Sequence, residues 1–253
     1  MINVVISGCN GSMGRALTNI IDEMDDMKIV AGIDKNINLY NNNYPVYESP
    51  LSIKEKCDVI IDFSQPSNLD GLLEYSINNN IAIVIATTGF SEEQELKIKE
   101  ASKFTRIFMS SNTSLGVNVL INLSKQATNI LGNMTDIEII EKHHNKKVDA
   151  PSGTAKMIAN AINKELDNSM EFNYGRYGND SKRKEKEIGI HAIRGGTIPG
   201  EHTVICAGLD EIIEIKHTAL SKKVFAQGAI KAAQYILEKD NGIYYIDMFI
   251  NNN

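Results

Sequence analysis

The chain has 253 residues, of which 42% are hydrophobic and 23% charged, and a formal net charge of −6. This length suffices for two domains of ordinary size or one large α/β domain, and the acidic balance argues against a nucleic-acid-binding protein. Three widely spaced cysteines, Cys9, Cys57 and Cys206, argue against a disulfide framework and against a zinc site. We expect a soluble cytoplasmic protein, because neither a signal peptide nor an apolar run of the ~18 residues needed for a membrane span is evident.

Short apolar runs alternate with helical patterns in the first 112 residues. The runs predict strands at 2–7, 28–33, 58–62, 81–86 and 106–109. Apolar residues at helical spacing predict helices near 13–24, 69–77 and 92–104. The Asn-rich stretch 36–44 lacks periodicity and is predicted to be a loop. Strands that alternate with helices in this way predict an α/β fold with a doubly wound parallel sheet.

The pattern changes after about Asn112. Helices are predicted over 116–131, 154–166 and 223–238, and strands over 136–141, 188–193, 201–206 and 211–217. The last three of these strands are joined by short links, which predicts an open mixed or antiparallel sheet in a second, α+β domain. The charged run 182–187 is predicted to be a solvated loop. A short apolar tail covers 243–250.

Three glycines follow the first predicted strand with the spacing G-x-x-G-x-x-G. Gly8, Gly11 and Gly14 lie between a strand and a helix, where small residues let the backbone approach a pyrophosphate at the helix N-terminus. Asp34, near the end of the second strand, has a carboxylate that accepts hydrogen bonds from a ribose of NAD. It would repel the extra phosphate of NADP, although adjacent Lys35 offsets this. A tight turn in an unrelated α/β protein is the alternative.

Two further polar clusters lie where a doubly wound sheet binds ligands, at the carboxyl ends of strands. The first follows the fourth strand and the second follows the fifth. They consist of Ala86, Thr87, Thr88 and Gly89, and of Ser110, Ser111 and Asn112. Their hydroxyl and backbone groups are placed to reach a nicotinamide, but loops commonly contain such residues anyway.

The most distinctive stretch runs from Glu141 to Thr154. It contains two adjacent histidines, two lysines and a Pro-Ser-Gly-Thr turn that opens the next helix. The N–H groups of Gly153 and Thr154 can cradle an anion, Lys147 adds a positive charge, and His143 or His144 can deliver a proton. This combination suits the reduction of a small carboxylated imine. The alternative is a solvated basic loop with a helix cap, whereas a zinc site is disfavoured because neighbouring histidines rarely converge on one ion.

The chain resembles the 4-hydroxy-tetrahydrodipicolinate reductases, also called dihydrodipicolinate reductases. The resemblance rests on the segment from Glu141 to Thr154 and extends over most of the chain. The other similar motifs are the first glycine turn, Ala86-Thr-Thr-Gly-Phe90, Ser111-Asn-Thr-Ser-Leu-Gly-Val-Asn118, Glu187-Ile-Gly-Ile-His-Ala-Ile-Arg-Gly-Gly196 and Gly200-Glu-His-Thr203.

The resemblance implies a reaction and a domain arrangement. The reaction is the NAD(P)H-dependent replacement of the ring hydroxyl by hydride with loss of water, which gives tetrahydrodipicolinate in the diaminopimelate route to lysine. No metal is implied. A Rossmann domain would comprise residues 1–113 and, through a returning C-terminal helix, 218–253. A substrate domain would comprise 114–217 and assemble the chain into a homotetramer through its sheet.

The resemblance also implies residue roles. His143 matches the proton donor, and Lys147 matches a second acid that also contacts substrate. His144, Gly153 and Thr154 match positions that hold the substrate carboxylates. The cofactor contacts, with Lys35 added from its position beside Asp34, are Gly8, Cys9, Asn10, Gly11, Ser12, Met13, Asp34, Lys35, Ala86, Thr87, Thr88, Ser110, Ser111, Asn112 and Thr113.

Several positions depart from the family pattern, and none belongs to the proton donor or the carboxylate cradle. Asn10 stands where Gly or Ala is frequent, Ser12 where Arg is frequent, Thr113 where an aromatic residue can occur, and Lys222 where Arg is usual. Because Ser12 supplies no cation for a 2′-phosphate, we expect use of either cofactor with a lean towards NADH. Two alternatives remain at this point: another Rossmann oxidoreductase, such as an amino-acid or sugar dehydrogenase, and a regulator that senses NAD(H) without turnover.

Overall fold

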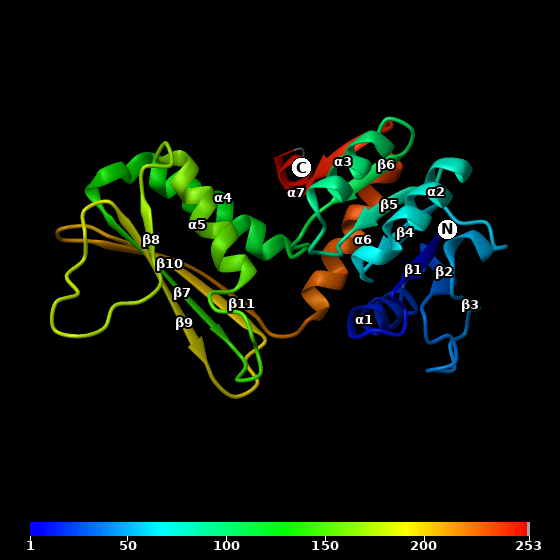
Figure 1. The fold of residues 1–253 in the computed structure, drawn as a ribbon, viewed down its shortest axis with the longest axis horizontal. Helices are drawn as coiled ribbons and strands as arrows, with labels where there is room; N and C mark the ends of the chain where they lie inside the picture. The colour runs from blue at the N-terminus through cyan, green and yellow to red at the C-terminus, as the bar shows by residue number, and fades with distance from the viewer. Residues whose placement is uncertain (252–253) are drawn as a thin grey trace. The chain divides into compact units, whose positions relative to one another are not determined.

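The computed structural model describes residues 1–251. The chain divides into two compact units, Met1–Leu115 with Lys222–Asn253, and Gly116–Ser221. Each unit has its own sheet and its own helices, as the ribbon shows (Figure 1). The second unit is therefore a continuous insertion in the first, and the chain returns to the first unit after Ser221.

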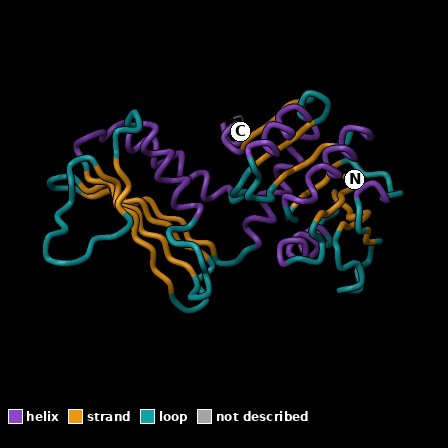
Figure 2. Tube along the Cα trace, in the orientation of Figure 1, coloured by secondary structure: helices purple, strands orange, loops and turns teal. Residues whose placement is uncertain are grey.

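The first unit contains a seven-stranded sheet in which every neighbouring pair is parallel (Figure 2). The strand order is β12-β6-β5-β4-β1-β2-β3, so the order on either side of β1 reverses, as in a Rossmann fold. The strands are β1 (Ile2–Ser7), β2 (Met27–Ile33), β3 (Val46–Tyr47), β4 (Val59–Asp62), β5 (Ala82–Ile85), β6 (Arg106–Met109) and β12 (Gly242–Tyr245). The predicted doubly wound parallel sheet is confirmed.

Helices cover both faces of this sheet. They are α1 (Ser12–Ile21), α2 (Leu69–Asn79), α3 (Glu92–Ala101), α6 (Lys223–Leu237) and α7 (Ile246–Asn251). Alternate residues of β1 enter different cores: Val4 packs in a cluster with α1 and α6, whereas Val5 packs in a cluster with α2 and α3. This alternation makes β1 apolar along its whole length, which is why the sequence shows an unbroken apolar run there.

The second unit contains a mixed five-stranded sheet with the order β11-β10-β7-β9-β8. β10 is antiparallel to both of its neighbours, whereas β7 and β8 are parallel to β9. The strands are β7 (Asp136–His143), β8 (Glu171–Asn173), β9 (Glu187–Arg194), β10 (Gly200–Ala207) and β11 (Ile212–Ala219). The helices α4 (Leu115–Leu131) and α5 (Gly153–Glu165) pack against one face of the sheet through an apolar core that includes Ile139, Ile158 and Val204.

Three short strands were not anticipated. β3 and β8 have two and three residues, too few to show a periodic pattern. The apolar tail, left without an assigned structure, forms β12, which pairs in parallel with β6, and then α7. Short apolar runs do not reveal whether a segment becomes a strand or a helix, since both bury such residues.

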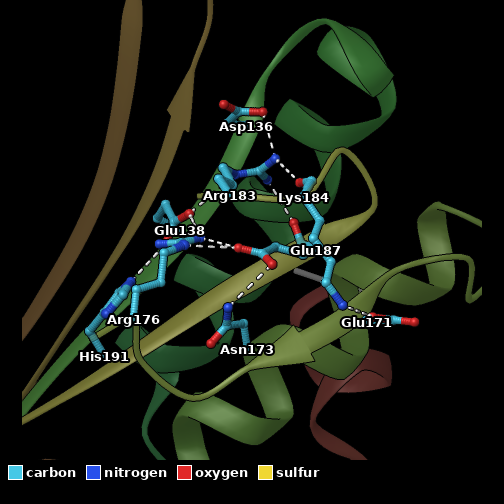
Figure 3. Close-up of polar contacts among 9 residues, drawn as sticks. All are labelled: Asp136, Glu138, Glu171, Asn173, Arg176, Arg183, Lys184, Glu187 and His191. Carbon is cyan, nitrogen blue, oxygen red and sulfur yellow. Dashed lines mark hydrogen bonds and ion pairs between the residues drawn. The ribbon is translucent and has the colours of Figure 1, made fainter. Parts of the chain in front are cut away.

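The charged segment between β8 and β9 is more ordered than its composition indicates (Figure 3). Arg176 and Arg183 both donate to Glu138 on β7, and His191 lies 2.7 Å from the same carboxylate. Arg176 also donates to Glu187, which is buried. Gly189 makes room for this network, because a Cβ there would overlap the Glu138 carboxylate. The expectation of a solvated loop over 182–187 was therefore wrong for Arg183 and Glu187.

Candidate active site

The glycine turn after β1 is closed by backbone contacts that leave no space for side chains. Gly8 has a φ of +78°, and a Cβ there would lie 2.6 Å from the carbonyl oxygen of Phe63. A Cβ on Gly14 would lie 2.3 Å from the carbonyl oxygen of Gly8, so α1 packs directly on the turn. The N-terminus of α1 is thereby brought to the carboxyl end of the sheet, which suits a pyrophosphate.

Two cavities lie along this carboxyl edge, within the first unit. One, of about 210 Å³, is lined by Gly8, Gly11, Ile33, Asp34, Lys35, Asn36, Phe63, Ser64, Gln65 and Asn68. The other, of about 250 Å³, is lined by Met13, Phe63, Ala86, Ser110, Ser111, Asn112, Thr113, Lys222 and Phe225. Phe63 lines both, so the two cavities adjoin. Their extent fits an elongated dinucleotide, with Asp34 in one and Ala86 in the other.

Most of the sequence-predicted cofactor residues line these two cavities, but several do not. The Cys9 side chain is fully buried and packs beside Gly32 and Tyr44, so only its backbone is available to a ligand. The buried Asn10 side chain bonds to Asn36 and Asn42. Ser12, Thr87 and Thr88 are also absent from the linings, and the Thr87 hydroxyl accepts from the backbone N–H of Ser64.

Some cavity residues had not been anticipated. Phe63, Ser64 and Gln65 follow β4, and the rule that ligands bind at the carboxyl ends of strands could have identified them. Lys222 and Phe225 lie at the start of α6, more than a hundred residues after Thr113. The sequence contains no local signal for this pairing. Gly228 explains it, because a Cβ there would overlap the carbonyl oxygen of Thr113.

In the second unit, the end of β7 brings His143 to a buried carboxylate. Nδ1 of His143 lies 2.6 Å from Oε2 of Glu141, two residues earlier on the same side of the strand. Arg194 of β9 donates to both carboxylate oxygens at 2.8 and 2.7 Å. The backbone N–H of Ser152 donates to Oε1 at 2.9 Å. Glu141 is 0% exposed and His143 9%, so this cluster lies beneath the surface.

Burial and charge set the protonation of this cluster. Burial acts to raise the pKa of Glu141, but hydrogen bonds from Arg194, His143 and Ser152 outweigh it and hold that pKa below its usual value. Burial lowers the pKa of His143, although Glu141 opposes the shift. His202, whose ring centroid is 5.2 Å from that of His143, is 3% exposed, and burial followed by the charge of His143 lowers its pKa to about 4.

The turn after β7 leads to the N-terminus of α5. Ser152 caps this helix by accepting from the N–H of Ala155, and its hydroxyl lies 3.1 Å from Nε2 of His202. Gly153 and Thr154 form the first turn of the helix. Nζ of Lys147 lies 2.7 Å from Asp149, and its side chain is 22% exposed, whereas Lys146 is exposed and His144 is half-buried. The structure thus keeps His143, His144, Lys147, Gly153 and Thr154 within one strand-turn-helix segment.

Comparison with known proteins identifies the family. Its N-terminal profile, described as dihydrodipicolinate reductase, N-terminus, matches residues 2–113, and the C-terminal profile matches 116–250. The chain belongs to the dihydrodipicolinate reductase family. It is 49% identical over 252 residues to the 4-hydroxy-tetrahydrodipicolinate reductase of Clostridium novyi, with 100% of this chain and 99% of that protein covered. The Clostridium tetani reductase is 47% identical, with 100% and 98% covered.

Membership of this family makes the chain an NAD(P)H-dependent oxidoreductase. The dipicolinate-bound dihydrodipicolinate reductase of Paenisporosarcina sp. TG-14 shares the fold, with a TM-score of 0.80, 24% identity and 97% of each chain covered. Within residues 1–251, no helix has the length and apolar character of a transmembrane segment. In the same residues, no three His, Cys, Asp or Glu side chains are grouped so that they could hold a metal ion.

Proposed function

We propose that this family member reduces 4-hydroxy-tetrahydrodipicolinate to tetrahydrodipicolinate with loss of water, with His143 and Lys147 as its acids and the first unit holding the nucleotide. The observation that carries these roles is the strand-turn-helix segment, in which the buried pair of Glu141 and His143 lies directly before the anion-binding N-terminus of α5. The amino-acid and sugar dehydrogenase alternatives, and a sensor without turnover, leave this segment unexplained.

The first unit, proposed as residues 1–113 with 218–253, binds the nucleotide. When bound, the reduced nicotinamide supplies the hydride. The chain contributes backbone N–H groups of the glycine turn for the pyrophosphate, Asp34 for the adenosine ribose, and the segments Ala86–Thr88 and Ser110–Thr113 for the nicotinamide. Since Asp34 places a carboxylate where a 2′-phosphate would lie, we propose use of NADH at least equal to that of NADPH.

The second unit, proposed as residues 114–217, binds the dicarboxylate. His144, Gly153 and Thr154 hold the two carboxylates, and Lys147 both contacts substrate and serves as a second acid. His143 delivers the proton that accompanies reduction. The Paenisporosarcina protein was solved with dipicolinate, a planar ring dicarboxylate. A ligand of that class matches the positive charge and helix N-terminus gathered after β7.

Assembly and location complete the proposal. The face of the second sheet opposite α4 and α5 carries exposed apolar side chains, among them Ile193 at 46% and Ile212 at 64%. We propose that this face joins copies of the chain into a homotetramer that acts in the cytoplasm. Light scattering of the purified protein tests the assembly, and a monomer at micromolar concentration would contradict it.

The decisive experiment follows oxidation of NADH by the purified chain with enzymatically generated substrate. We expect turnover that depends on both reactants and is inhibited by dipicolinate competitively with substrate. Inhibition competitive with NADH alone would contradict the placement of the carboxylate cradle. Binding of NADH without turnover would favour the sensor.

A further inference from the structure

We infer that Glu141 is a positioning residue for His143, which holds the Nδ1–H tautomer of the ring and so makes Nε2 the nitrogen that exchanges the proton with substrate. This inference rests on the proposed function of His143 and extends it by assigning a role to Glu141 and a specific atom to the proton transfer. The identification of a histidine as an acid leaves open which of its two nitrogens acts.

The hydrogen bonds around the Glu141 carboxylate determine the direction of its bond with His143. Oε1 accepts from Ser152 N and Arg194 Nη2, and Oε2 accepts from Arg194 Nη1 and lies 2.6 Å from His143 Nδ1. Three of these four contacts come from groups that only donate. An ionised carboxylate only accepts, so Nδ1 must carry the hydrogen. Arg194 and Ser152 keep Glu141 ionised, because they stabilise its charged form.

The other edge of the ring is left open for a reacting group. A Cβ at Gly200, the first residue of β10, would lie 3.2 Å from Nε2 of His143. Glycine therefore avoids a methyl group that would crowd this nitrogen. Nε2 of His202 is directed to the Ser152 hydroxyl at 3.1 Å, so that nitrogen already has a partner. Proton exchange at Nε2 leaves the Nδ1 bond with Glu141 intact in both protonation states.

The charged groups around His143 give Glu141 a measurable effect on its titration. Burial lowers the pKa of His143, and Lys147 and Arg194 act in the same direction. Charging of His202 opposes charging of His143, since the two rings are in contact. Glu141 is the group that favours the imidazolium. Without its negative charge the imidazolium is lost at lower pH, and the alkaline limb of an acid-dependent rate moves to lower pH.

The same strand offers a matched control on its opposite face. Glu138 contacts His191 at 2.7 Å and two arginines, Arg176 and Arg183 (Figure 3). Glu138→Gln thus removes a carboxylate from a similar arginine-histidine cluster without touching His143. Its effect on stability should be comparable with that of Glu141→Gln, but it should leave the His143 limb of the pH profile in place.

The test combines nitrogen NMR with kinetics. In protein labelled with ¹⁵N-histidine, His143 is identified among the five histidines by its absence from His143→Gln. We expect neutral His143 in wild type to carry its proton on Nδ1. In Glu141→Gln, the limb of kcat against pH should move down by roughly one to three pH units, with about a tenfold loss of kcat per unit at higher pH. Glu141→Asp keeps the charge, so its limb should stay within about one unit of wild type.

A double variant separates positioning from general damage. If Glu141 acts through His143, Glu141→Gln in a His143→Gln background should cost little further kcat. An Nε2–H tautomer in wild type, an unmoved limb in folded Glu141→Gln, or effects that multiply in the double variant would each overturn the inference. The NMR result on wild type remains available even if Glu141→Gln does not fold. Failure of wild type to oxidise NADH would instead contradict the proposed function, and the tautomer would still be measured.

Discussion

Asp34 and Asn10 are joined by a hydrogen bond: the backbone N–H of Asn10 donates to Oδ2 of Asp34 at 3.1 Å. This bond ties the glycine turn after β1 to the end of β2. The other oxygen, Oδ1, accepts from the backbone N–H of Asn36 at 2.9 Å. The carboxylate is thereby held in the cavity that Gly8 and Gly11 also line, with acceptor capacity remaining on each oxygen for ribose hydroxyls.

We predict that Asp34→Ala shifts cofactor preference towards NADPH by about 1–3 kcal/mol in relative kcat/KM. A 2′-phosphate meets like charge at Asp34 in wild type, and the single flexible cation of Lys35 only softens the repulsion. Measurement of kcat/KM for both cofactors in both proteins checks this. Lys35→Ala is the matched control, because it should strengthen the NADH lean. A wild type that prefers NADPH tenfold, with no change in Asp34→Ala, would show that this carboxylate does not lie at the ribose.

His143→Ala should lower turnover by about 10²–10⁴-fold, the usual contribution of general acid catalysis. NADH affinity should hardly change, because the glycine turn and His143 belong to different compact units. Steady-state kinetics and a fluorescence titration of NADH provide the two readouts. Near-normal turnover would mean that the proton comes from another group, and loss of NADH binding would indicate misfolding.

The two neighbouring lysines should behave differently. Lys147 is half-buried and paired with Asp149 at 2.7 Å, whereas Lys146 is exposed. We predict that Lys147→Ala raises KM for substrate and lowers kcat, each by roughly tenfold or more, while Lys146→Ala changes either by less than about twofold. The two variants should be compared side by side at one pH. Equal effects would show that the active lysine has been misassigned.

His202 should make the fold sensitive to mild acid. Its pKa is lowered to about 4, principally by burial, so the folded state favours neutral His202 and the unfolded chain binds the proton more tightly. The free energy of unfolding should therefore fall as pH drops from about 6.5 towards 4, by up to ~3 kcal/mol from this residue. Urea unfolding at a series of pH values measures the slope. His202→Gln should flatten it in this window, and an unchanged slope would contradict the assignment.

The sequence alone determined the fold class of each half and the candidate groups of the active site. Apolar runs that alternate with helical patterns predict a parallel sheet because such strands are buried on both faces. The glycine turn was recognisable because its small residues meet a strict steric requirement, now visible in the contacts that a Cβ on Gly14 would make. The segment from Glu141 to Thr154 was recognisable because its chemistry is concentrated in adjacent positions.

Tertiary structure decided the contacts between residues far apart in the chain. Arg194 reaches Glu141 only because β9 pairs in parallel beside β7, and His202 approaches His143 only because β10 pairs on the other side. Lys222 joins the cavity at Ser110 because α6 returns to the first sheet. Local periodicity reports which face of an element is buried, but strand order depends on long-range packing. For that reason the sequence identified His143, whereas only the fold revealed the carboxylate that holds it.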